Sequence, residues 1–500
     1  MYDVIIIGAG VSGSAAAREL SRYRLSVCVL EREEDVCSGT SKANSGVVHA
    51  GYDALPGTLK AKLNILGNEM MDQLCSDLDI PFRRIGSLVV CAEGEDPEML
   101  HTLLRRGMEN SVPGLRLITD RKELEEMEPN IGDAVTAALY APTAGIICPF
   151  TLNLAMAENA AENGVEFRFS LPVEEIRRED DGYSVFCGKE VIRTRTVFNA
   201  AGVYGDVFHN QVSGKKVNIT PRRGEYLLYD KKAGSAAGHV IFSLPGKKGK
   251  GILVAPTVHG NLLMGPTAED VPEKEMTDTT AAALQRIRER GTVSVKNVSP
   301  KLVITSFAGL RAHEDGGDFI IREAEDAPGF VDCIGIESPG LTACPAIGVM
   351  AAEIICGILH PEKKDHFLEK RQGIRRIADL PAEERNRMIR ENPAYGRIVC
   401  RCEEVSEGEI LEALHGIIPA VSMDGIKRRV RAGMGRCQGG FCTPKVMDLL
   451  ARECSIPLTE VKKSGSGSPL ILSMGKRTAG TDAPHTAPET ERGRDHEEKI

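Results

Sequence analysis

The chain has 500 residues, of which 42% are hydrophobic and 27% are charged, and its formal net charge is −9. This length predicts about two to four domains with a sizeable core. The negative charge argues against non-specific nucleic-acid binding. The absence of Trp, together with only 4% aromatic residues, argues against surfaces that stack nucleic-acid bases.

The N-terminus leads directly into a predicted strand, so no signal peptide is expected and the 14 cysteines are expected to be reduced, as in a cytosolic protein. The most apolar long stretch, residues 330–359, contains Asp332, Glu337, Pro339 and Glu353. These residues favour a strand, loop and helix of a soluble core over a membrane span. We therefore expect a cytoplasmic protein with no transmembrane segment of its own.

The first predicted element is a buried strand over residues 4–7, followed by a glycine turn and a helix. Gly8 permits the tight turn, Gly10 lets a pyrophosphate approach the backbone, and Gly13 lets the helix pack close to the strand. The N-terminus of the helix adds N–H groups and the positive end of a dipole. This combination predicts a dinucleotide-binding unit, with an ordinary glycine-rich turn as the alternative.

A second strand is predicted over residues 25–30, and it ends at Glu31, where a carboxylate can accept hydrogen bonds from ribose hydroxyls. The polar stretch that follows, residues 38–52, can lay backbone and hydroxyl donors along a bound cofactor. It contains His49 among apolar and small residues. Spacing alone favours a satisfied buried histidine here over a functional one.

The middle of the chain is predicted to contain helices, strands and one antiparallel sheet. The sheet is expected over residues 217–265, where apolar and polar residues alternate. Arg222 and Arg223 at its entrance are either a solvated pair or an anion clamp. A strand ends in Ala-Ala-Gly at residues 200–202, which marks either a close approach of the backbone to a ligand or an ordinary turn.

The helix predicted over residues 60–80 has an apolar face made of Leu63, Leu66, Met70 and Leu74. Further helices are predicted over residues 149–163, 281–290 and 346–359, and further strands over residues 85–91, 302–307 and 331–336.

Two close cysteine pairs, Cys400 with Cys402 and Cys437 with Cys442, flank residues 403–436. Four thiolates can hold a zinc ion or a [2Fe–2S] cluster, and this spacing is not that of a usual zinc ribbon. A disulfide is disfavoured in a reducing compartment. The mixed charges of residues 361–393 predict a solvated connector that contains a helix.

Three regions carry a resemblance to a known family: the N-terminal glycine fingerprint, residues 199–206 and residues 308–342. Residues 1–365 resemble the FAD-dependent oxidoreductases of the D-amino-acid oxidase-like superfamily. Within it they are similar to the anaerobic-type glycerol-3-phosphate dehydrogenase large subunits and to the L-2-hydroxyglutarate oxidase group. Residues 396–455 resemble the bacterioferritin-associated-ferredoxin-like [2Fe–2S] domain.

The resemblance implies an α/β (α+β overall) fold. Its parts are a Rossmann-like FAD-binding domain, an inserted antiparallel-sheet substrate domain and a small, mostly helical C-terminal [2Fe–2S] domain. The implied FAD-binding parts are about 1–85, 145–215 and 300–365, and the substrate-domain parts are about 86–144 and 216–299. A connector over residues 366–395, the cluster domain over residues 396–455 and a disordered tail over residues 464–500 complete the chain.

The resemblance also implies roles for individual residues. His49 lies beside the flavin as a candidate base, and Arg311 suits a substrate carboxylate or phosphate. The ADP half of FAD is expected at Gly8, Gly10, Gly13 and Glu31, the pyrophosphate and flavin at Thr40, Ser41, Asn44, Ser45 and Gly46, and the adenine side at Ala201 and Gly202. The isoalloxazine ring is expected near Gly309, Gly340, Leu341 and Thr342, and the cluster ligands are Cys400, Cys402, Cys437 and Cys442.

The implied function is an FAD-dependent dehydrogenase of a small anionic 2-hydroxy compound, with sn-glycerol 3-phosphate as the first choice. Electrons would pass through the [2Fe–2S] centre to a partner protein, either a second flavoprotein or a quinone-linked subunit that could hold the enzyme peripherally at the inner membrane face. The alternatives are an L-2-hydroxyglutarate dehydrogenase or oxidase, to which residues 44–51 are more similar, a proline- or sarcosine-type amino-acid dehydrogenase subunit, and a redox relay subunit.

Overall fold

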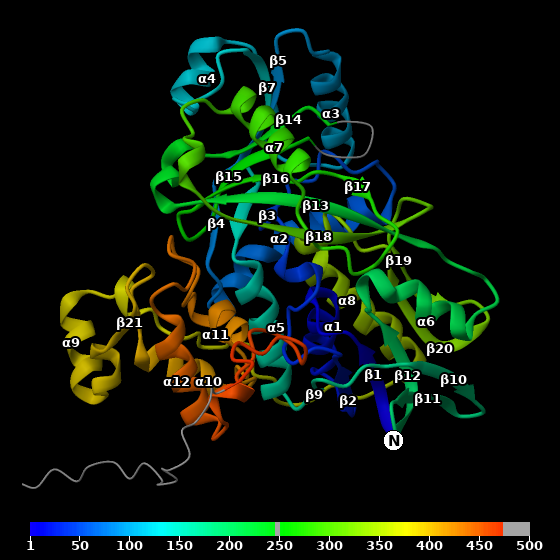
Figure 1. Ribbon diagram of the computed structural model, residues 1–500. Helices are drawn as coiled ribbons and strands as arrows, with labels where there is room; N and C mark the ends of the chain where they lie inside the picture. The colour runs from blue at the N-terminus through cyan, green and yellow to red at the C-terminus, as the bar shows by residue number, and fades with distance from the viewer. Residues whose placement is uncertain (246–250, 474–500) are drawn as a thin grey trace, which may run out of the picture.

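The structure, a computed structural model, describes residues 1–245 and 251–473 (Figure 1). Within these residues a first sheet of eight strands is built around β1, which pairs in parallel with β2 on one side and β12 on the other. Its central strands are continuous apolar runs because both faces of a parallel sheet are buried. The strands are β1 (Tyr2–Ile7), β2 (Val27–Leu30), β9 (Glu166–Arg168), β10 (Glu175–Glu179), β11 (Gly182–Cys187), β12 (Glu190–Asn199), β19 (Ile320–Ala324) and β20 (Ala327–Ile334).

Helices cover this sheet and connect its parallel strands. Helix α1 follows β1 directly and packs between α5 and α8. Helix α8 also packs along α2, so it joins the N-terminal segment to the last part of the first sheet's layer. These helices are α1 (Val11–Leu20), α2 (Leu59–Asp77), α5 (Pro149–Glu162), α6 (Gly205–Val212) and α8 (Gly340–Leu359).

A second sheet, of nine strands in the described chain, lies above the first in Figure 1. Its longest pair, β13 with β18, is antiparallel as predicted, but β14 pairs with β5 in parallel. The strands are β5 (Ser87–Ala92), β6 (Arg116–Ile118), β7 (Val135–Ala141), β13 (Ile219–Tyr229), β14 (Val240–Ser243), β15 (Leu253–Pro256), β16 (Leu262–Gly265), β17 (Glu269–Asp270) and β18 (Val303–Glu314). Helices α3 (Glu98–Glu109), α4 (Arg121–Met127) and α7 (Ala281–Ser294) pack on it, and β3 (Val47–Val48), β4 (Phe82–Arg84) and β8 (Gly145–Ile147) form a small third sheet.

The C-terminal domain has its own apolar core and lies beside α5 (Figure 1). It consists of β21 (Ile398–Cys400), β22 (Val405–Ser406), α10 (Glu407–His415), α11 (Met423–Val430) and α12 (Thr443–Glu453). Buried Asp35, which follows β2 of the first sheet, ties this domain to the rest of the chain, because its carboxylate accepts hydrogen bonds from Arg428 at 2.7 Å and from Arg429 at 2.7 and 2.8 Å. Burial raises the pKa of Asp35, but the two guanidinium groups outweigh it and hold that pKa below its usual value.

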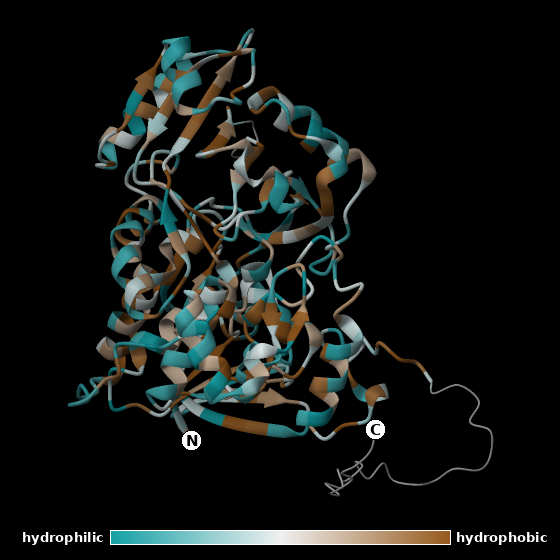
Figure 2. Cartoon of the chain, turned by 90° about the vertical axis from the view of Figure 1, so that its left-hand side faces the viewer, coloured by the Kyte–Doolittle hydropathy of each residue, from teal (hydrophilic) through white to brown (hydrophobic). Residues whose placement is uncertain are grey.

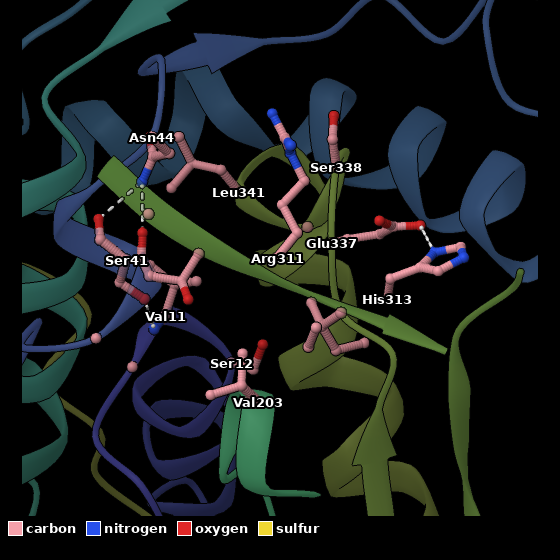
Figure 3. A pocket seen from close by; sticks show the side chains of 18 of the residues that line it. Val11, Ser12, Ser41, Asn44, Val203, Arg311, His313, Glu337, Ser338 and Leu341 are labelled. Carbon is pink, nitrogen blue, oxygen red and sulfur yellow. Dashed lines mark hydrogen bonds and ion pairs between the residues drawn. The ribbon is translucent and has the colours of Figure 1, made fainter. Parts of the chain in front are cut away.

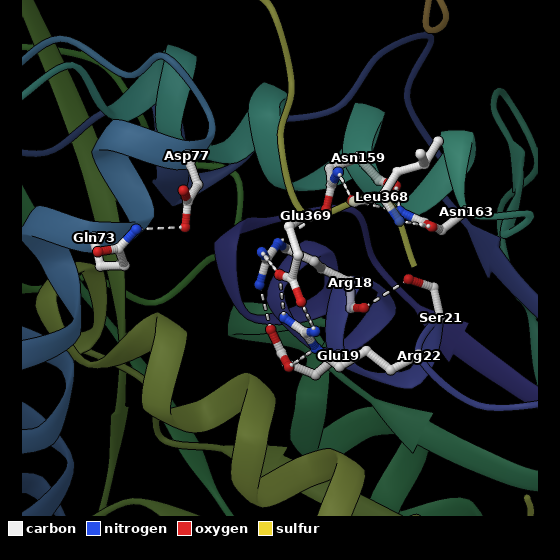
Figure 4. A network of polar contacts seen from close by, with 10 residues as sticks. All are labelled: Arg18, Glu19, Ser21, Arg22, Gln73, Asp77, Asn159, Asn163, Leu368 and Glu369. Carbon is white, nitrogen blue, oxygen red and sulfur yellow. Dashed lines mark hydrogen bonds and ion pairs between the residues drawn. The ribbon is translucent and has the colours of Figure 1, made fainter. Parts of the chain in front are cut away.

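The connector is more firmly bound than its charge pattern predicted (Figure 4). Arg22, two residues after the end of α1, pairs with Glu369 at 2.7 Å, and the side-chain amide of Asn159 donates to the carbonyl of Leu368 at 2.8 Å. Arg371 pairs with Glu158 at 2.5 Å, with both side chains nearly buried. The solvated part with a helix begins only later, at α9 (Ala382–Glu391).

Three expectations need correction: one about the buried face of a helix and two about where an element begins or the ordered chain ends. Leu66 is 41% exposed, because α2 buries Asn64, Gly67 and Asn68 instead. Helix α8 begins at Gly340, six residues earlier than residue 346, with Pro345 inside it. The expected tail is ordered up to residue 473, where Ser464 hydrogen-bonds Glu34 at 3.3 Å, and residues 474–500 lie outside the described chain.

Hydrophobic residues concentrate in the strands and in the helices packed on them (Figure 2). Helix α8 has a mean hydropathy of 1.9 and is long enough to cross a membrane, but 56% of that stretch is buried. It packs against α1 and α2. The burial and these contacts identify it as a core helix.

Candidate functional site

A cavity of about 870 Å³ opens where the carboxyl ends of β1, β2 and β12 meet the inner face of the second sheet. This volume is at the upper end of the range for ligand pockets. Ligands of open parallel sheets bind at the carboxyl ends of the strands. The opposite wall comes from β13, β14, β15 and β18, so the two sheets enclose one elongated site.

The glycine turn closes tightly around one end of the cavity. Gly8 has φ +97°, and a Cβ there would lie 2.7 Å from the carbonyl oxygen of Ala200. A Cβ at Gly13 would lie 2.0 Å from the carbonyl oxygen of Gly8. Helix α1 therefore starts directly at the cavity wall, and its first turn presents N–H groups to a phosphate. Ser41 accepts one of them, from Val11, at 3.0 Å (Figure 3).

Glu31 lies at the end of β2 on the cavity wall, as predicted for a ribose partner. Its carboxylate also accepts backbone hydrogen bonds from Ala9 at 2.8 Å and from Glu33 at 3.0 Å. Burial raises the pKa of Glu31 and the two N–H donors oppose that shift. The carboxylate is thus fixed in place by the same turn that surrounds Gly8.

The polar stretch after β2 forms a rigid lining. Thr40 donates to the carbonyl of Leu310 at 2.6 Å, which joins this stretch to β18. The amide of Asn44 donates to the carbonyl of Ser41 at 2.8 Å and accepts from the N–H of Gly46 at 2.9 Å. The loop therefore keeps its shape through its own side chains.

His49 and Arg311 both line the cavity. Nε2 of His49 lies 3.2 Å from the hydroxyl of Ser338, and its ring centroid is 5.9 Å from that of Phe242. Arg311, on β18, donates to the carbonyl of Thr267 at 3.2 and 3.3 Å. An imidazole and a guanidinium in one cavity suit the oxidation of an anionic hydroxy compound.

A second polar group beside Arg311 was not predicted. Nδ1 of His313 lies 3.2 Å from Glu337, whose carboxylate also accepts from Lys60 at 2.7 Å (Figure 3). Burial raises the pKa of Glu337, but Lys60 and His313 outweigh it and lower that pKa below its usual value. One sequence signal was available: His313 is two positions after Arg311 on the same strand and so shares its face.

Only one of the two arginines at residues 222 and 223 reaches the cavity. Arg222 lines it and is opposite Arg311 in the β13–β18 register, and its Nε pairs with Asp270 at 2.6 Å. Arg223 points to the other face, as successive residues of a strand must. It is 6% exposed and pairs with Asp278 at 2.8 Å. An anion clamp that includes Arg223 is therefore excluded.

The predicted cofactor residues fall into two groups. Gly13, Gly46 and Thr342 lie behind the cavity wall: Thr342, for instance, is buried and accepts a hydrogen bond from the N–H of His49. The remaining predicted residues, which line the cavity, are Gly8, Gly10, Glu31, Thr40, Ser41, Asn44, Ser45, Ala201, Gly202, Gly309, Gly340 and Leu341.

The four C-terminal cysteines form two thiol pairs. Cys442 lies next to Cys400, and Cys437 lies next to Cys402. The Cys442 contact, aided by the backbone N–H groups of Gly433 and Glu403, lowers the pKa of the Cys400 thiol to about 6. Thiolate is the form that binds iron. The N–H groups of Phe441, Gly439 and Gly440 point to Cys437 in the same way.

This arrangement suits a binuclear cluster better than zinc. Structural zinc needs four ligands around one ion, and a Cys-x-Cys pair with a Cys-x4-Cys pair is not a usual zinc-ribbon spacing. Two separate thiol pairs match two irons with two thiolates each. Gly435 packs directly on Cys402, where a Cβ would lie 2.3 Å from the Cβ of that cysteine.

Comparisons with known proteins agree with both sites. Residues 3–354 match the family described as FAD dependent oxidoreductase, and residues 398–452 match the BFD-like [2Fe-2S] binding domain. The chain is 48% identical over 477 residues to a glycerol 3-phosphate dehydrogenase of Caloramator mitchellensis, which covers 95% of this chain and 99% of the relative.

Two further comparisons extend this result. The structure of reduced L-alpha-glycerophosphate oxidase from Mycoplasma pneumoniae with FAD bound matches with a TM-score of 0.70 and 32% identity, covering 74% of this chain and 98% of that one. An L-2-hydroxyglutarate dehydrogenase of Indibacter alkaliphilus is 28% identical over 397 residues, covering 70% of this chain and 98% of the relative.

Proposed function

This chain belongs to the FAD-dependent oxidoreductase family and carries a BFD-like [2Fe-2S] binding domain, and we propose that it oxidises sn-glycerol 3-phosphate to dihydroxyacetone phosphate. The observation that carries the proposal is the end-to-end similarity to the Caloramator glycerol 3-phosphate dehydrogenase, which includes the cysteine domain as well as the flavin-type fold.

In the proposed reaction the secondary hydroxyl of the substrate loses its proton and its carbon loses a hydride, which leaves a ketone. FAD, when bound, supplies the hydride acceptor, and the [2Fe–2S] cluster supplies a one-electron centre. Nε2 of His49 is assigned the hydroxyl proton, because this imidazole lines the same cavity as Arg311. Its backbone is fixed by Thr342 at 2.9 Å and by the amide of Asn68 at 2.9 Å.

The phosphate of the substrate is assigned to Arg311. A guanidinium offers several N–H donors in one plane, which suits two oxygens of one phosphate. Arg222 and Lys60 add positive charge along the same cavity, and each is already paired with a carboxylate, Asp270 and Glu337 respectively. The described partners of Arg311 are neutral, the carbonyl of Thr267 and the side chain of Tyr226, so its charge suits the phosphate best.

Oxidation of L-2-hydroxyglutarate is the second candidate. The similarity of residues 44–51 to that group and the full-length match to the Indibacter enzyme favour it. That substrate has a hydroxyl beside a carboxylate, so Arg311 and His49 could serve it in the same roles. The two candidates differ in the anion that the cavity holds.

An anaerobic titration of the purified flavoprotein distinguishes them. Bleaching of the flavin absorption by glycerol 3-phosphate at low millimolar concentration is the expected result. Bleaching by L-2-hydroxyglutarate alone would replace the proposal with the second candidate. If neither compound bleaches the bound FAD, both proposals are wrong, and amino acids such as proline and sarcosine are tested next.

We further infer that the physiological acceptor is a protein, either a second flavoprotein or a quinone-linked subunit. The cluster domain supports this, because a one-electron centre after a flavin serves a protein acceptor. We place the reaction in the cytoplasm, with attachment to the inner membrane face through that partner. Fractionation of cells before and after a high-salt wash tests the location: retention in the washed membrane would contradict peripheral attachment.

A further inference from the structure

We propose that the acceptor docks on the surface formed by Arg401, Arg436, Phe441 and Lys445, the cluster edge, and that its docking face is acidic. The inference rests on the proposed electron transfer through the cluster. It adds the place of contact and the chemistry of the partner.

The thiol pairs are not equally buried, and this decides which side of the cluster faces outward. Cys400 and Cys442 are 1% and 3% exposed. Cys402 and Cys437 are only half-buried. A partner that takes electrons must approach the centre closely, so the side that carries Cys402 and Cys437 is the exit.

Phe441 is the most exposed aromatic side chain of the described chain, at 82%. It directly precedes Cys442, and its N–H points to Cys437. Exposed aliphatic residues are common on soluble proteins, but an aromatic ring directly beside a redox centre is a suitable interface anchor. Transient electron-transfer interfaces are small, so one such ring is a large share of the apolar contact.

The charge around the ligands is opposite to that of the whole chain. Among exposed residues within three positions of a ligand, Arg397, Arg401, Arg436 and Lys445 are basic and only Glu404 is acidic, although Arg397 is paired with Glu407 at 2.7 Å. Arg436 lies 3.7 Å from Asp230, whereas Arg401 and Lys445 form no ion pair with any residue that the structure describes. The whole chain carries −9. A local positive patch of this kind steers an acidic partner and disfavours a basic one.

The same features could bring the cluster edge to an anionic membrane. Two observations favour the protein partner. A net charge of −9 repels an anionic lipid surface beyond the patch. A single exposed ring is also little apolar area for membrane binding, which scales with buried apolar area.

The test uses stopped-flow mixing of the full-length holoenzyme, pre-reduced with stoichiometric dithionite. The acceptors are the acidic haem protein cytochrome b5 and the basic haem protein cytochrome c. Pre-reduction removes any dependence on the substrate, so this result is separate from that of the flavin-bleaching titration. FAD and cluster absorption are recorded for every variant to confirm that both groups are retained.

The wild type is expected to reduce cytochrome b5 at a rate that falls steeply with ionic strength. Lys445→Glu and Arg401→Glu are each expected to slow it by about tenfold at low salt and to accelerate cytochrome c reduction. Lys462→Glu, the same charge change on the same domain away from the ligands, is expected to leave both rates unchanged. Phe441→Ala is expected to slow cytochrome b5 reduction several-fold, whereas Leu472→Ala, at an 88% exposed position, is not.

Equal rates in all cluster-edge variants and their controls would overturn the proposal. Co-sedimentation with vesicles of one part phosphatidylglycerol to three parts phosphatidylcholine tests the membrane alternative. If Phe441→Ala lowers this co-sedimentation but leaves cytochrome b5 reduction unchanged, the proposal is also overturned, because the cluster edge then binds a membrane. If the wild-type enzyme does not reduce a dye with glycerol 3-phosphate, but the dithionite-reduced enzyme does reduce cytochrome b5, only the proposed substrate is contradicted.

Discussion

The N–H of His49 donates a hydrogen bond to the hydroxyl oxygen of Thr342 at 2.9 Å, across 293 positions of sequence. The candidate base on the N-terminal segment is therefore held by the first turn of α8. The same hydroxyl lies 3.4 Å from the carbonyl of Val47 and can donate to it. Thr342 thus fixes the backbone on which the imidazole sits, although it does not line the cavity.

Thr342→Val should weaken both stability and catalysis. It keeps the shape of the side chain but leaves a buried N–H without its acceptor, at a cost of about 1–3 kcal/mol. We expect a lower midpoint of thermal unfolding and a lower kcat with FAD still bound. Thr342→Ser keeps the hydroxyl and should behave like the wild type. Equal behaviour of the Val and Ser variants would show that this hydrogen bond does not position His49.

His49→Asn should abolish most of the activity without loss of FAD. Removal of a general base typically lowers the rate by about 10²–10⁴-fold. The rate of anaerobic flavin bleaching by glycerol 3-phosphate measures this step directly. His101→Asn, at an exposed position on α3, is the matched control. A bleaching rate within twofold of the wild type, about 0.4 kcal/mol in the barrier, would remove His49 from the proposed mechanism.

Cys437→Ser should eliminate the visible absorption of the cluster and leave bound FAD. The two sites lie in separate cores, and no cysteine of the cluster lines the cavity. Dye reduction by the substrate should therefore continue, while reduction of a protein acceptor stops. Cys454→Ser, an exposed cysteine of the same domain, should change neither spectrum. Loss of FAD together with the cluster would contradict two independent modules.

Asp35→Asn should loosen the C-terminal domain from the flavin-type fold. The neutral side chain leaves two buried guanidinium groups without their carboxylate. Removal of one partner of a buried ion pair lowers the free energy of unfolding by about 3–5 kcal/mol. Hydrogen exchange in α11 is expected to accelerate, while α1 and α5 stay protected. Glu34→Gln is the milder control, since Glu34 binds only the hydroxyls of Ser422 and Ser464. Equal exchange rates in both variants would show that Asp35 does not hold the domain.

Stability should depend on pH through His209. Its Nδ1 lies 2.7 Å from Asp332 and its Nε2 lies 2.6 Å from the carbonyl of Lys215, so both partners are acceptors. The hydrogen bond to Asp332 raises the pKa of His209 above 6.5. A raised folded-state pKa means stability that is fully present below the unfolded pKa and is lost as pH rises through the folded one.

The midpoint of thermal unfolding between pH 6 and pH 9 checks this sign. We expect the wild type to lose stability over that range and His209→Gln to lose less. His415→Gln, at a surface histidine with a 60% exposed side chain, should keep the wild-type slope. An unchanged slope in His209→Gln would assign the pH dependence to other groups.

The sequence could predict the first strand, the glycine turn and the acidic residue at Glu31, because their spacing is local. It could also place His49 and Arg311 at one site, but only through a resemblance. The network of Lys60, His313 and Glu337 could not be found in this way. Its members are distant in sequence, with 277 positions between Lys60 and Glu337, and only the folded chain brings together α2, β18 and the residues just before α8.

The error at Leu66 and the choice that the sequence left open at Arg222 and Arg223 also have physical causes. The helix α2 was assigned an apolar face, but its buried side includes Asn64 and Asn68, whose amides hydrogen-bond the carbonyl of His49. Polar groups of the site thus determined the face. Arg222 and Arg223 could not both face the cavity, because a strand alternates, and the choice between them depended on the pairing of β13 with β18.

The order of strands in the first sheet determines when the cofactor site can form during synthesis of the chain. Strand β1 is made first, yet its parallel neighbour β12 begins at Glu190, roughly 10–40 s later at a ribosomal speed of about 5–20 residues per second. Two further lining residues of the cavity, Gly340 and Leu341 at the start of α8, are synthesised later still. FAD can therefore be bound only when most of the chain has left the ribosome, and until then β1 has β2 as its only parallel neighbour in the described sheet.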